Sequence, residues 1–356
     1  MNHVAIDLGS RESQICVRSA DGTVLTEDRW PTRSLGKYLA KLPASRVVME
    51  TCAEAFQVAD VAQESGHEVV VVPGMLVRAL GVGARGLKND VRDARNLSEA
   101  SCRMAKLPSV HIPSARSREL KTVCGMRDAL VGARTKLVNT VRGWLRAQAF
   151  GRPSAGCVLT FPRRIKALLE KHHRPLPGFV ARQLATIDHL TEQVVQADRE
   201  LEQDAKSDPV CRRLMSVPGV GPVTALRFLA AIDEIKRFSS AHSVRSYLGL
   251  TPGENSSSER QRTTSITKAG AKHLRWCLVQ AAWTARRTRK DDPMSLWAKQ
   301  IEIRRGKAIA TVALASKIAG ILFALWRDGN SYQASRSAAA PAPAEIPAPV
   351  ATPAAH

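Results

Sequence analysis

Four acidic residues among the first hundred positions are placed where they could hold divalent metal ions. Asp7 lies in the segment VAIDLGS and Glu50 in RVVMETC, and each closes or follows a short β-branched run. Asp90 and Asp93, in KNDVRDAR, are spaced i, i+3 and therefore share one face of a helix. Clustered carboxylates serve phosphoryl transfer by holding two Mg²⁺ ions about 4 Å apart, one at the attacking oxygen and one at the leaving oxygen. Hard oxygen ligands suit Mg²⁺ or Mn²⁺, and the histidines show no zinc-ligand spacing, so the sequence predicts magnesium- or manganese-dependent phosphodiester chemistry.

A second candidate centre is the serine run Ser256-Ser257-Ser258 in GLTPGENSSSE. By composition alone, three serines beside Gly and Pro are most often a flexible loop. The stretch from 258 to 287, however, contains one acid, Glu259, among seven basic residues: Arg260, Arg262, Lys268, Lys272, Arg275, Arg286 and Arg287. In so cationic a setting a serine hydroxyl could attack phosphorus while the neighbouring charges stabilise the transition state.

The elements expected around the acids follow a recognisable order. VAIDLG, SQICVRSA and GTVLTEDRW predict three strands joined by turns. A short helix around 35–42, a strand at 46–49, a helix around 53–64, a strand at 68–72 and helices from about 75 onward follow. Three strands and then alternating helix and strand is the order of an RNase H domain. The alternative is a generic α/β domain with acids at its strand ends by chance.

Two long helices are expected next. Between about 114 and 150, apolar residues recur every three to four positions, as in an amphipathic helix. This segment has eight basic residues and two acidic ones, an excess that favours phosphate contacts over a solvated charged face. The basic residues of this helix include Arg134, Arg142 and Arg146. After Pro177-Gly178, four apolar residues recur every seven positions and predict a helical hairpin or short coiled coil, within one chain or between two: Val180, Ile187, Val194 and Leu201.

The segment Pro218-Gly219-Val220-Gly221-Pro222 leads into an apolar helix and is typical of a helix-hairpin-helix. Gly219 and Gly221 could let backbone N–H groups approach a phosphate closely, although an ordinary turn between helices is the alternative. Residues 308–326 are nearly long enough to span a bilayer, but Lys317 lies mid-run and a buried helix is favoured. After Asn330 the chain is mostly Ala, Pro and Ser, so residues 331–356 are expected to be disordered.

Charge and cysteine content bound the class of protein. Lys and Arg outnumber Asp and Glu by 53 to 32, a formal charge of +21 that favours a polyanionic partner, with nucleic acid the leading candidate. Charge alone does not choose an activity. The seven cysteines form no C-x-x-C pair and no signal peptide is evident, so a reduced, cytoplasmic, nucleoid-associated protein is expected, with no membrane partner.

Several ordered blocks resemble one family, the Piv/MooV-type DEDD transposases of bacterial insertion sequences, which are bridge-RNA-guided serine recombinases. The resemblance covers roughly residues 1–328. It rests on IDLGS at 6–10, METC at 49–52, KNDVRDA at 88–94, PGVGPVTA at 218–225, and YLGLTP through SITKAGAKHLR at 247–275.

The resemblance implies a RuvC-like domain over 1–112 that bears Asp7, Glu50, Asp90 and Asp93. A basic helical, coiled-coil region over 113–208 and a mainly helical transposase domain over 209–330, with the helix-hairpin-helix and a catalytic serine, would follow. In the family's Pro-x-x-x-Ser-Ser-Gly pattern, counted from Pro252, the nucleophile is Ser257 and Ser256 is the alternative. Here Ser258 replaces the pattern's glycine.

The same resemblance implies a phosphoserine intermediate with DNA, assistance from Mg²⁺ or Mn²⁺ on a partner subunit's carboxylates, and a homodimer or homotetramer. A noncoding bridge RNA would select donor and target DNA by base pairing. The residues predicted to bind nucleic acid are Arg134, Arg142, Arg146, Gly219, Gly221, Arg260, Arg262, Lys268, Lys272 and Arg275. Two rivals stay open: a RuvC-like junction resolvase or nuclease without serine catalysis, and a nucleic-acid-binding protein without catalysis.

Overall fold

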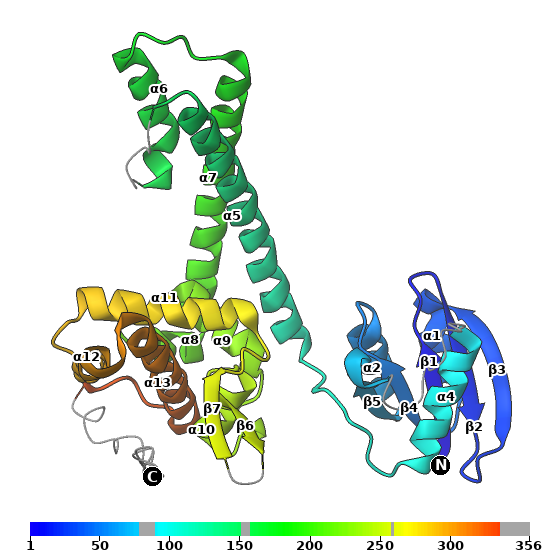
Figure 1. Cartoon of the computed structure of the whole chain (residues 1–356). Helices are drawn as coiled ribbons and strands as arrows, with labels where there is room; N and C mark the ends of the chain where they lie inside the picture. Colours follow the sequence, from blue (N-terminus) through cyan, green and yellow to red (C-terminus); the bar gives the residue numbers. More distant parts are fainter. Residues whose placement is uncertain (78–89, 151–156, 258–259, 335–356) are drawn as a thin grey trace, which may run out of the picture. The chain divides into compact units, whose positions relative to one another are not determined.

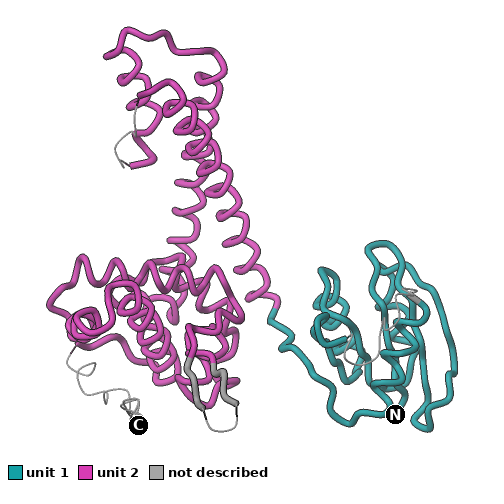
Figure 2. Tube along the Cα trace, viewed as in Figure 1, with its two compact units in different colours: residues 1–114 teal, residues 115–356 magenta. Residues whose placement is uncertain are grey.

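A computed structural model of the chain describes residues 1–77, 90–150, 157–257 and 260–334 (Figure 1). The chain divides into two compact units that meet in sequence at Ser114 and Ala115 (Figure 2). The predicted division into three domains and a tail stays a prediction.

The first unit is built on a five-stranded sheet with the strand order β3-β2-β1-β4-β5. β1, β2 and β3 pair antiparallel in succession, whereas β4 pairs parallel with both β1 and β5. The strands are β1 (Asn2–Asp7), β2 (Glu12–Arg18), β3 (Val24–Pro31), β4 (Ser45–Glu50) and β5 (Glu68–Val72). The helical elements are η1 (Thr32–Ser34), α1 (Leu35–Leu39), α2 (Ala55–Glu64), α3 (Gly74–Val77) and α4 (Asp90–Arg103). The predicted succession of strands and helices, and hence a mixed α/β N-terminal part, is confirmed.

Both faces of the sheet are covered, which explains why its central strands are continuous apolar runs. Val4 and Ile6 of β1 lie in one buried cluster with residues of α1 and α2. Ala5 lies in a second buried cluster on the opposite face, with Leu97 and Ala100 of α4. The alternation of side chains along β1 therefore fixes which face α4 occupies.

The second unit begins with a long helical hairpin (Figure 1). Its two arms are α5 (Ala115–Ala147) and α7 (Gly178–Ser207), and η3 (Val158–Thr160) and α6 (Phe161–Lys171) lie between them in the chain. Val138, Val141 and Leu145 of α5 share a buried cluster with Val180 and Ile187 of α7. The apolar seven-residue repeat of α7 is thus buried within this chain.

The rest of the second unit is mainly helical, as predicted, with one two-stranded hairpin. Its elements are α8 (Pro209–Leu214), α9 (Pro222–Ile232), η4 (Ile235–Arg237), α10 (Ala241–Tyr247), β6 (Pro252–Ser257), β7 (Arg260–Ile266), α11 (Lys272–Thr288), α12 (Pro293–Arg305) and α13 (Lys307–Asp328). By length and composition α13 could cross a membrane, but half of its most apolar stretch is buried against its neighbours. Leu314, Ile318 and Phe323 of α13 belong to the main core of this unit, which agrees with the predicted buried helix.

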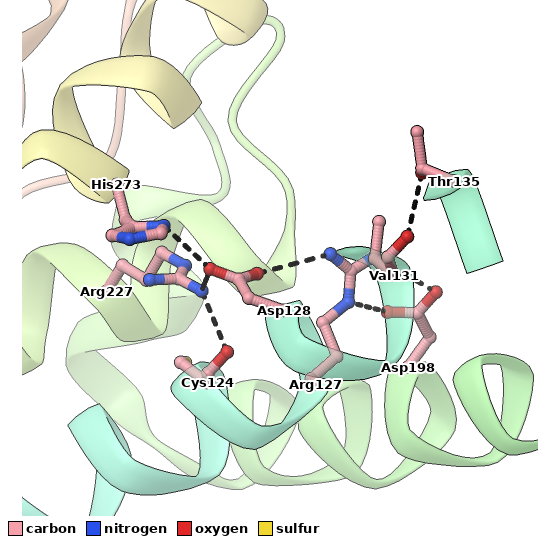
Figure 3. Close-up of polar contacts among 8 residues, drawn as sticks. All are labelled: Cys124, Arg127, Asp128, Val131, Thr135, Asp198, Arg227 and His273. Carbon is pink, nitrogen blue, oxygen red and sulfur yellow. Dashed lines mark hydrogen bonds and ion pairs between the residues drawn. The ribbon is translucent and has the colours of Figure 1, made fainter. Parts of the chain in front are cut away.

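The foot of the hairpin is joined to this helical body by a network of charged side chains (Figure 3). Asp128 of α5 forms ion pairs with Arg227 of α9 and with Nδ1 of His273 of α11, the latter at 2.9 Å. Beside it, Arg127 of α5 donates to Asp198 of α7 at 2.8 Å. The Arg227 guanidinium is nearly buried and is paired, which is the condition under which a buried charge is tolerated.

The start of the predicted disordered tail is held against the body. The backbone N–H of Tyr332 donates to the Ser216 hydroxyl at 2.8 Å, and the Tyr332 hydroxyl donates to the Asp292 carboxylate at 2.9 Å. The expected disorder of residues 331–356 stays a prediction, and Tyr332, near the start of this segment, makes two specific hydrogen bonds with the body. Residues 335–356 lie outside the described part of the chain.

Candidate metal and serine sites

Asp7 and Glu50 stand at the carboxyl ends of two neighbouring parallel strands. β1 and β4 pair in the register Ile6 with Met49, and Asp7 and Glu50 are the next residue of each strand. Because side chains alternate along a strand, both acids belong to the face that holds Ala5 and that α4 covers. The sheet therefore brings two acids that are far apart in sequence to one edge and one face.

α4 runs antiparallel to β1, so the helix begins near the edge at which β1 ends. Near the C-terminal end of α4, the Ser101 hydroxyl forms a hydrogen bond with Nδ1 of His3 at 2.9 Å. One turn earlier, the Ser98 hydroxyl forms a hydrogen bond with Sγ of Cys16 at 3.3 Å, and Cys16 pairs with Ala5 in the sheet. From Ser98 back to Asp93 the helix rises about 7.5 Å. From Ala5 to Asp7 the strand rises about 6.6 Å. Because the two rises are similar, the backbone of Asp93 lies about level with that of Asp7 along the strand direction. The backbone of Asp90 lies one helical turn further toward the start of α4.

The carboxylate of Asp93 has a feature that an ordinary surface acid lacks. Its Oδ1 is buried and has no hydrogen-bond partner within the structure as described. An unpaired carboxylate oxygen in such a place is costly unless a proton or a cation meets it. A cation bound at this oxygen would offset that cost, so Asp93 has the chemistry of a metal ligand.

The Glu50 side is closed by the segment that follows β5. The Gly74 N–H donates to Oγ1 of Thr51 at 3.1 Å. A Cβ added at Gly74 would lie only 2.5 Å from Oε1 of Glu50, so this glycine makes room for the carboxylate. The space for the Glu50 side chain is thus set by both β4 and the start of α3.

The four predicted acids are only partly assembled by what the structure describes. Within the described residues no three His, Cys, Asp or Glu side chains lie close enough together to hold a metal ion. The side chain of Asp90 is outside that description. The donors that the fold does gather at this edge are carboxylate oxygens, one of them orphaned and buried, and hard oxygen donors fit Mg²⁺ or Mn²⁺ rather than a soft metal.

The first two serines of the run lie in a strand rather than in the loop that the composition favours. Ser256 and Ser257 belong to β6, which pairs antiparallel with β7, and Ser257 stands opposite Arg260 in the register. Ser258 lies outside the described residues. Arg262 of β7 stands opposite Asn255. The register therefore places predicted cationic residues on the strand next to the serines.

The base of this hairpin is clamped by its own backbone and by one arginine. The Thr267 N–H donates to the Thr251 carbonyl at 3.0 Å. The Arg275 guanidinium donates to the carbonyls of Leu248 at 2.9 Å and Ala269 at 2.7 Å. A nucleic-acid contact of Arg275 stays a prediction; in the structure this side chain holds two carbonyls at the root of the hairpin.

The other predicted nucleic-acid contacts differ in their surroundings. Arg146, Lys268 and Lys272 are exposed. Arg134 is half-buried on α5, and burial, followed by the charge of Arg127, lowers its pKa. The Arg142 guanidinium lies 5.6 Å from the centre of the Phe161 ring and caps the core of the helical hairpin.

The two glycines of the predicted helix-hairpin-helix have different environments. Gly219 has φ +85°, and a Cβ there would lie 2.1 Å from the Ala281 carbonyl oxygen of α11, so this glycine is required for packing. Gly221 precedes α9 and has open space where a Cβ would be. Both glycines line a cavity of about 620 Å³ together with Thr288 and Arg289. They differ in whether a side chain could be added, not in whether they face this cavity.

The charged network at the foot of the hairpin was not predicted. Asp128, Arg227 and His273 come from three different helices, and nothing local in the sequence marks them as partners. Their one signal is chemical, since an arginine inside the apolar helix PVTALRFLAAI requires an acid from elsewhere.

Comparison with known proteins identifies transposases over most of the chain. Residues 4–149 match the model of the IS110-type DEDD transposases, and residues 211–296 match the transposase IS116/IS110/IS902 family. The chain is 28% identical to the transposase for insertion sequence element IS1328 of Yersinia enterocolitica, over 92% of this chain and 98% of that protein. It is 28% identical to the transposase for insertion sequence element IS1111A of Coxiella burnetii, over 93% and 91%. It is 31% identical to the putative transposase y4pF/y4sB of Sinorhizobium fredii, over 85% and 78%.

Proposed function

Because the chain belongs to the IS116/IS110/IS902 family of insertion-sequence transposases, enzymes that act on DNA, we propose that it cleaves and exchanges DNA strands with a serine nucleophile and metal-binding carboxylates. The observation that carries the proposal is the convergence of Asp7, Glu50 and the start of α4 at one edge of the sheet, with a buried orphan oxygen on Asp93.

In this proposal Asp7, Glu50, Asp90 and Asp93 hold Mg²⁺ or Mn²⁺. The ions, when bound, would polarise the scissile phosphate and stabilise the departing oxygen. Oδ1 of Asp93 is buried, and the parallel register of β1 and β4 keeps the backbones of Asp7 and Glu50 side by side. The fold would thus hold these carboxylates near one another although their negative charges repel.

Ser257 is the proposed nucleophile, and Ser256 is the alternative. The Ser257 oxygen forms an ester bond to phosphorus while the bond from phosphorus to the deoxyribose oxygen breaks. The serine proton passes, in net terms, to the departing oxygen, which leaves as a hydroxyl. The cations predicted near this site, including Arg260 and Arg262 on the adjacent strand, would offset the charge that develops on the phosphate.

Two further parts of the proposal concern partners. A noncoding RNA would pair with donor and target DNA, leaving the protein to bind RNA shape and backbone. Two or four copies of the chain would assemble so that one subunit's acids assist another's serine. The excess of basic residues over the whole chain supports a nucleic-acid partner.

The test is recombination between a donor and a target plasmid, supplemented by detection of a covalent protein–DNA adduct under denaturing conditions. Ser257→Ala is expected to abolish both recombination and the adduct, whereas Ser256→Ala, its matched control, keeps both. Asp7→Asn is expected to abolish recombination. If both serine variants recombine like the unmodified protein while Asp7→Asn does not, the activity is that of a metal-dependent resolvase or nuclease without serine catalysis.

A further inference from the structure

One face of α11 exposes a stripe of aromatic and basic side chains. The buried residues of this helix, among them Leu278, Ala281 and Ala285, face the core. On the opposite side the exposed residues recur at i, i+4, i+8, i+11 and i+15: Lys272, Trp276, Gln280, Trp283 and Arg287. Trp276 is 61% exposed and Trp283 is 37% exposed. Two large aromatic rings in solvent on one helical face mark an interaction surface rather than a core.

The charge of this face selects the chemistry of the partner. α11 spans seventeen residues and contains no acid. Nζ of Lys307, on α13, lies 5.2 Å from the centre of the Trp283 ring. The Arg286 guanidinium lies 5.5 Å from it and is paired with Glu302 of α12. A second copy of the same face would bring like charges together, which costs energy. A polyanion with flat rings fits this face, because its negative charges suit the basic side chains and its rings can stack on the tryptophans.

The position of the stripe relates it to the serine hairpin. β7 ends at Ile266 and α11 begins at Lys272, so the stripe starts directly after the hairpin that carries Ser257. Trp276 and Trp283 are seven residues apart, which is about 10 Å along the helix axis. Three nucleotides of a stacked strand rise by about the same distance. In Figure 1 α11 lies across the helical body on the same unit as β6 and β7.

We propose that the α11 stripe is a stacking platform for the unpaired bases of a DNA strand opened beside the cleavage site. Trp276 and Trp283 would stack on bases, which is a sequence-tolerant contact, while Lys272 and Arg287 meet the flanking phosphates. The inference rests on the proposed function, because strand exchange requires a duplex to be opened near the serine.

Binding of the full chain to a fluorescent oligo(dT) of about 12 nucleotides tests the platform. Trp276→Ala is expected to weaken binding roughly 5- to 100-fold, corresponding to the loss of one base–aromatic stack. Trp276→Phe keeps a stackable ring and is expected to bind within about threefold of the unmodified protein. Ile303→Ala removes an exposed apolar side chain on α12 and is the matched control, with unchanged affinity.

Two readouts separate stacking from a structural effect. The dependence of affinity on salt between about 50 and 200 mM is expected to be the same for Trp276→Ala and the unmodified protein, because phosphate contacts are retained. The tryptophan emission of the unmodified protein is expected to be quenched by oligo(dT), and less so in Trp276→Ala. A circular dichroism spectrum matching that of the parent shows that the variant is folded.

Four results would overturn the inference. Trp276→Ala could bind oligo(dT) like the parent, or it could lose duplex DNA affinity as strongly as single-strand affinity. The parent could bind oligo(rU) but not oligo(dT), which assigns the face to RNA. Trp276→Ala could form a smaller oligomer than the parent by light scattering while its DNA affinity per subunit is unchanged, which would assign the face to contact with a second copy of the chain. The proposed function fails separately, when Asp7→Asn and Ser257→Ala both recombine plasmids normally, whatever the oligo(dT) affinities show.

Discussion

Replacing Gly74 by alanine tests the role of the Glu50 carboxylate without removing any acid. The added Cβ would lie 2.5 Å from Oε1 of Glu50, whereas ordinary contact begins at 3.4 Å. The carboxylate oxygen must therefore retreat by about 0.9 Å, the difference between these two distances. The other near atoms also belong to the Glu50 side chain, so the carboxylate alone has to give way.

The two consequences of this displacement differ in size. Gly74 is not among the glycines with positive φ, so alanine fits its backbone, and the moving atoms are the end of a flexible, exposed side chain. The free energy of unfolding is expected to change by less than about 1 kcal/mol. Displacing a reacting group by about 1 Å, in contrast, costs on the order of 100-fold in rate. We expect plasmid recombination to fall about 100-fold with the melting temperature nearly unchanged.

The controls define what the result means. Gly125→Ala, on α5, adds a Cβ that meets nothing within 4 Å, and it is expected to leave activity unchanged and to raise the melting temperature slightly, because alanine favours a helix interior over glycine by about 0.5–1 kcal/mol. Glu50→Gln sets the level of complete loss. A Gly74→Ala protein that melts normally and recombines as fast as the parent would show that the Glu50 carboxylate takes no part in the reaction.

Three further predictions concern the second unit. Gly219→Ala places alanine at a positive φ and against the Ala281 carbonyl, so the free energy of unfolding is expected to fall by at least about 2 kcal/mol in denaturant titrations. At Gly221 a Cβ meets nothing, and Gly221→Ala is expected to lower the free energy of unfolding by at most about 1 kcal/mol. Arg275→Ala leaves two carbonyls without their donor, and about 1–3 kcal/mol of stability should be lost, together with faster proteolysis of the β6–β7 hairpin; equal proteolysis rates would contradict its clamping role. Burial raises the pKa of Cys277 from 9.0 to about 11, so the folded protein holds this proton more tightly, and its contribution to stability is present below pH 9 and lost as pH rises toward 11. Unfolding titrations across that range should show a steeper loss for the parent than for Cys277→Ala, and identical slopes would refute the assignment.

The sheet of the first unit could be predicted from sequence because its signals are local. The central strands contain continuous apolar runs, residues 4–6 of β1 and 47–49 of β4, as is typical of strands buried on both faces. The same locality made the acid site partly predictable. Asp7 and Glu50 follow their strands directly, and parallel neighbours end at the same edge.

The β6 strand shows where this reasoning fails. Its sequence PGENSS contains turn formers and no β-branched residue, so propensity favours a loop. The strand forms because residues on both sides fix its ends, namely the Thr251–Thr267 hydrogen bond and the Arg275 clamp. These contacts span some fifteen to thirty positions, and no short window of sequence contains both partners. Tertiary context therefore overrides propensity at the strand that carries Ser257.

The same limit applies to reading function from positive charge. A basic residue in a nucleic-acid enzyme is readily assigned to phosphate, yet Arg275 holds carbonyls, Arg142 covers Phe161 and Arg227 neutralises Asp128. Arginine suits such places because its planar fork makes several hydrogen bonds and its stem packs against apolar groups. The formal charge of the chain consequently overstates the surface that can bind a strand of DNA. Exposed cations that share a helical face with exposed aromatic rings are the more selective signal, and α11 combines both directly after the serine hairpin.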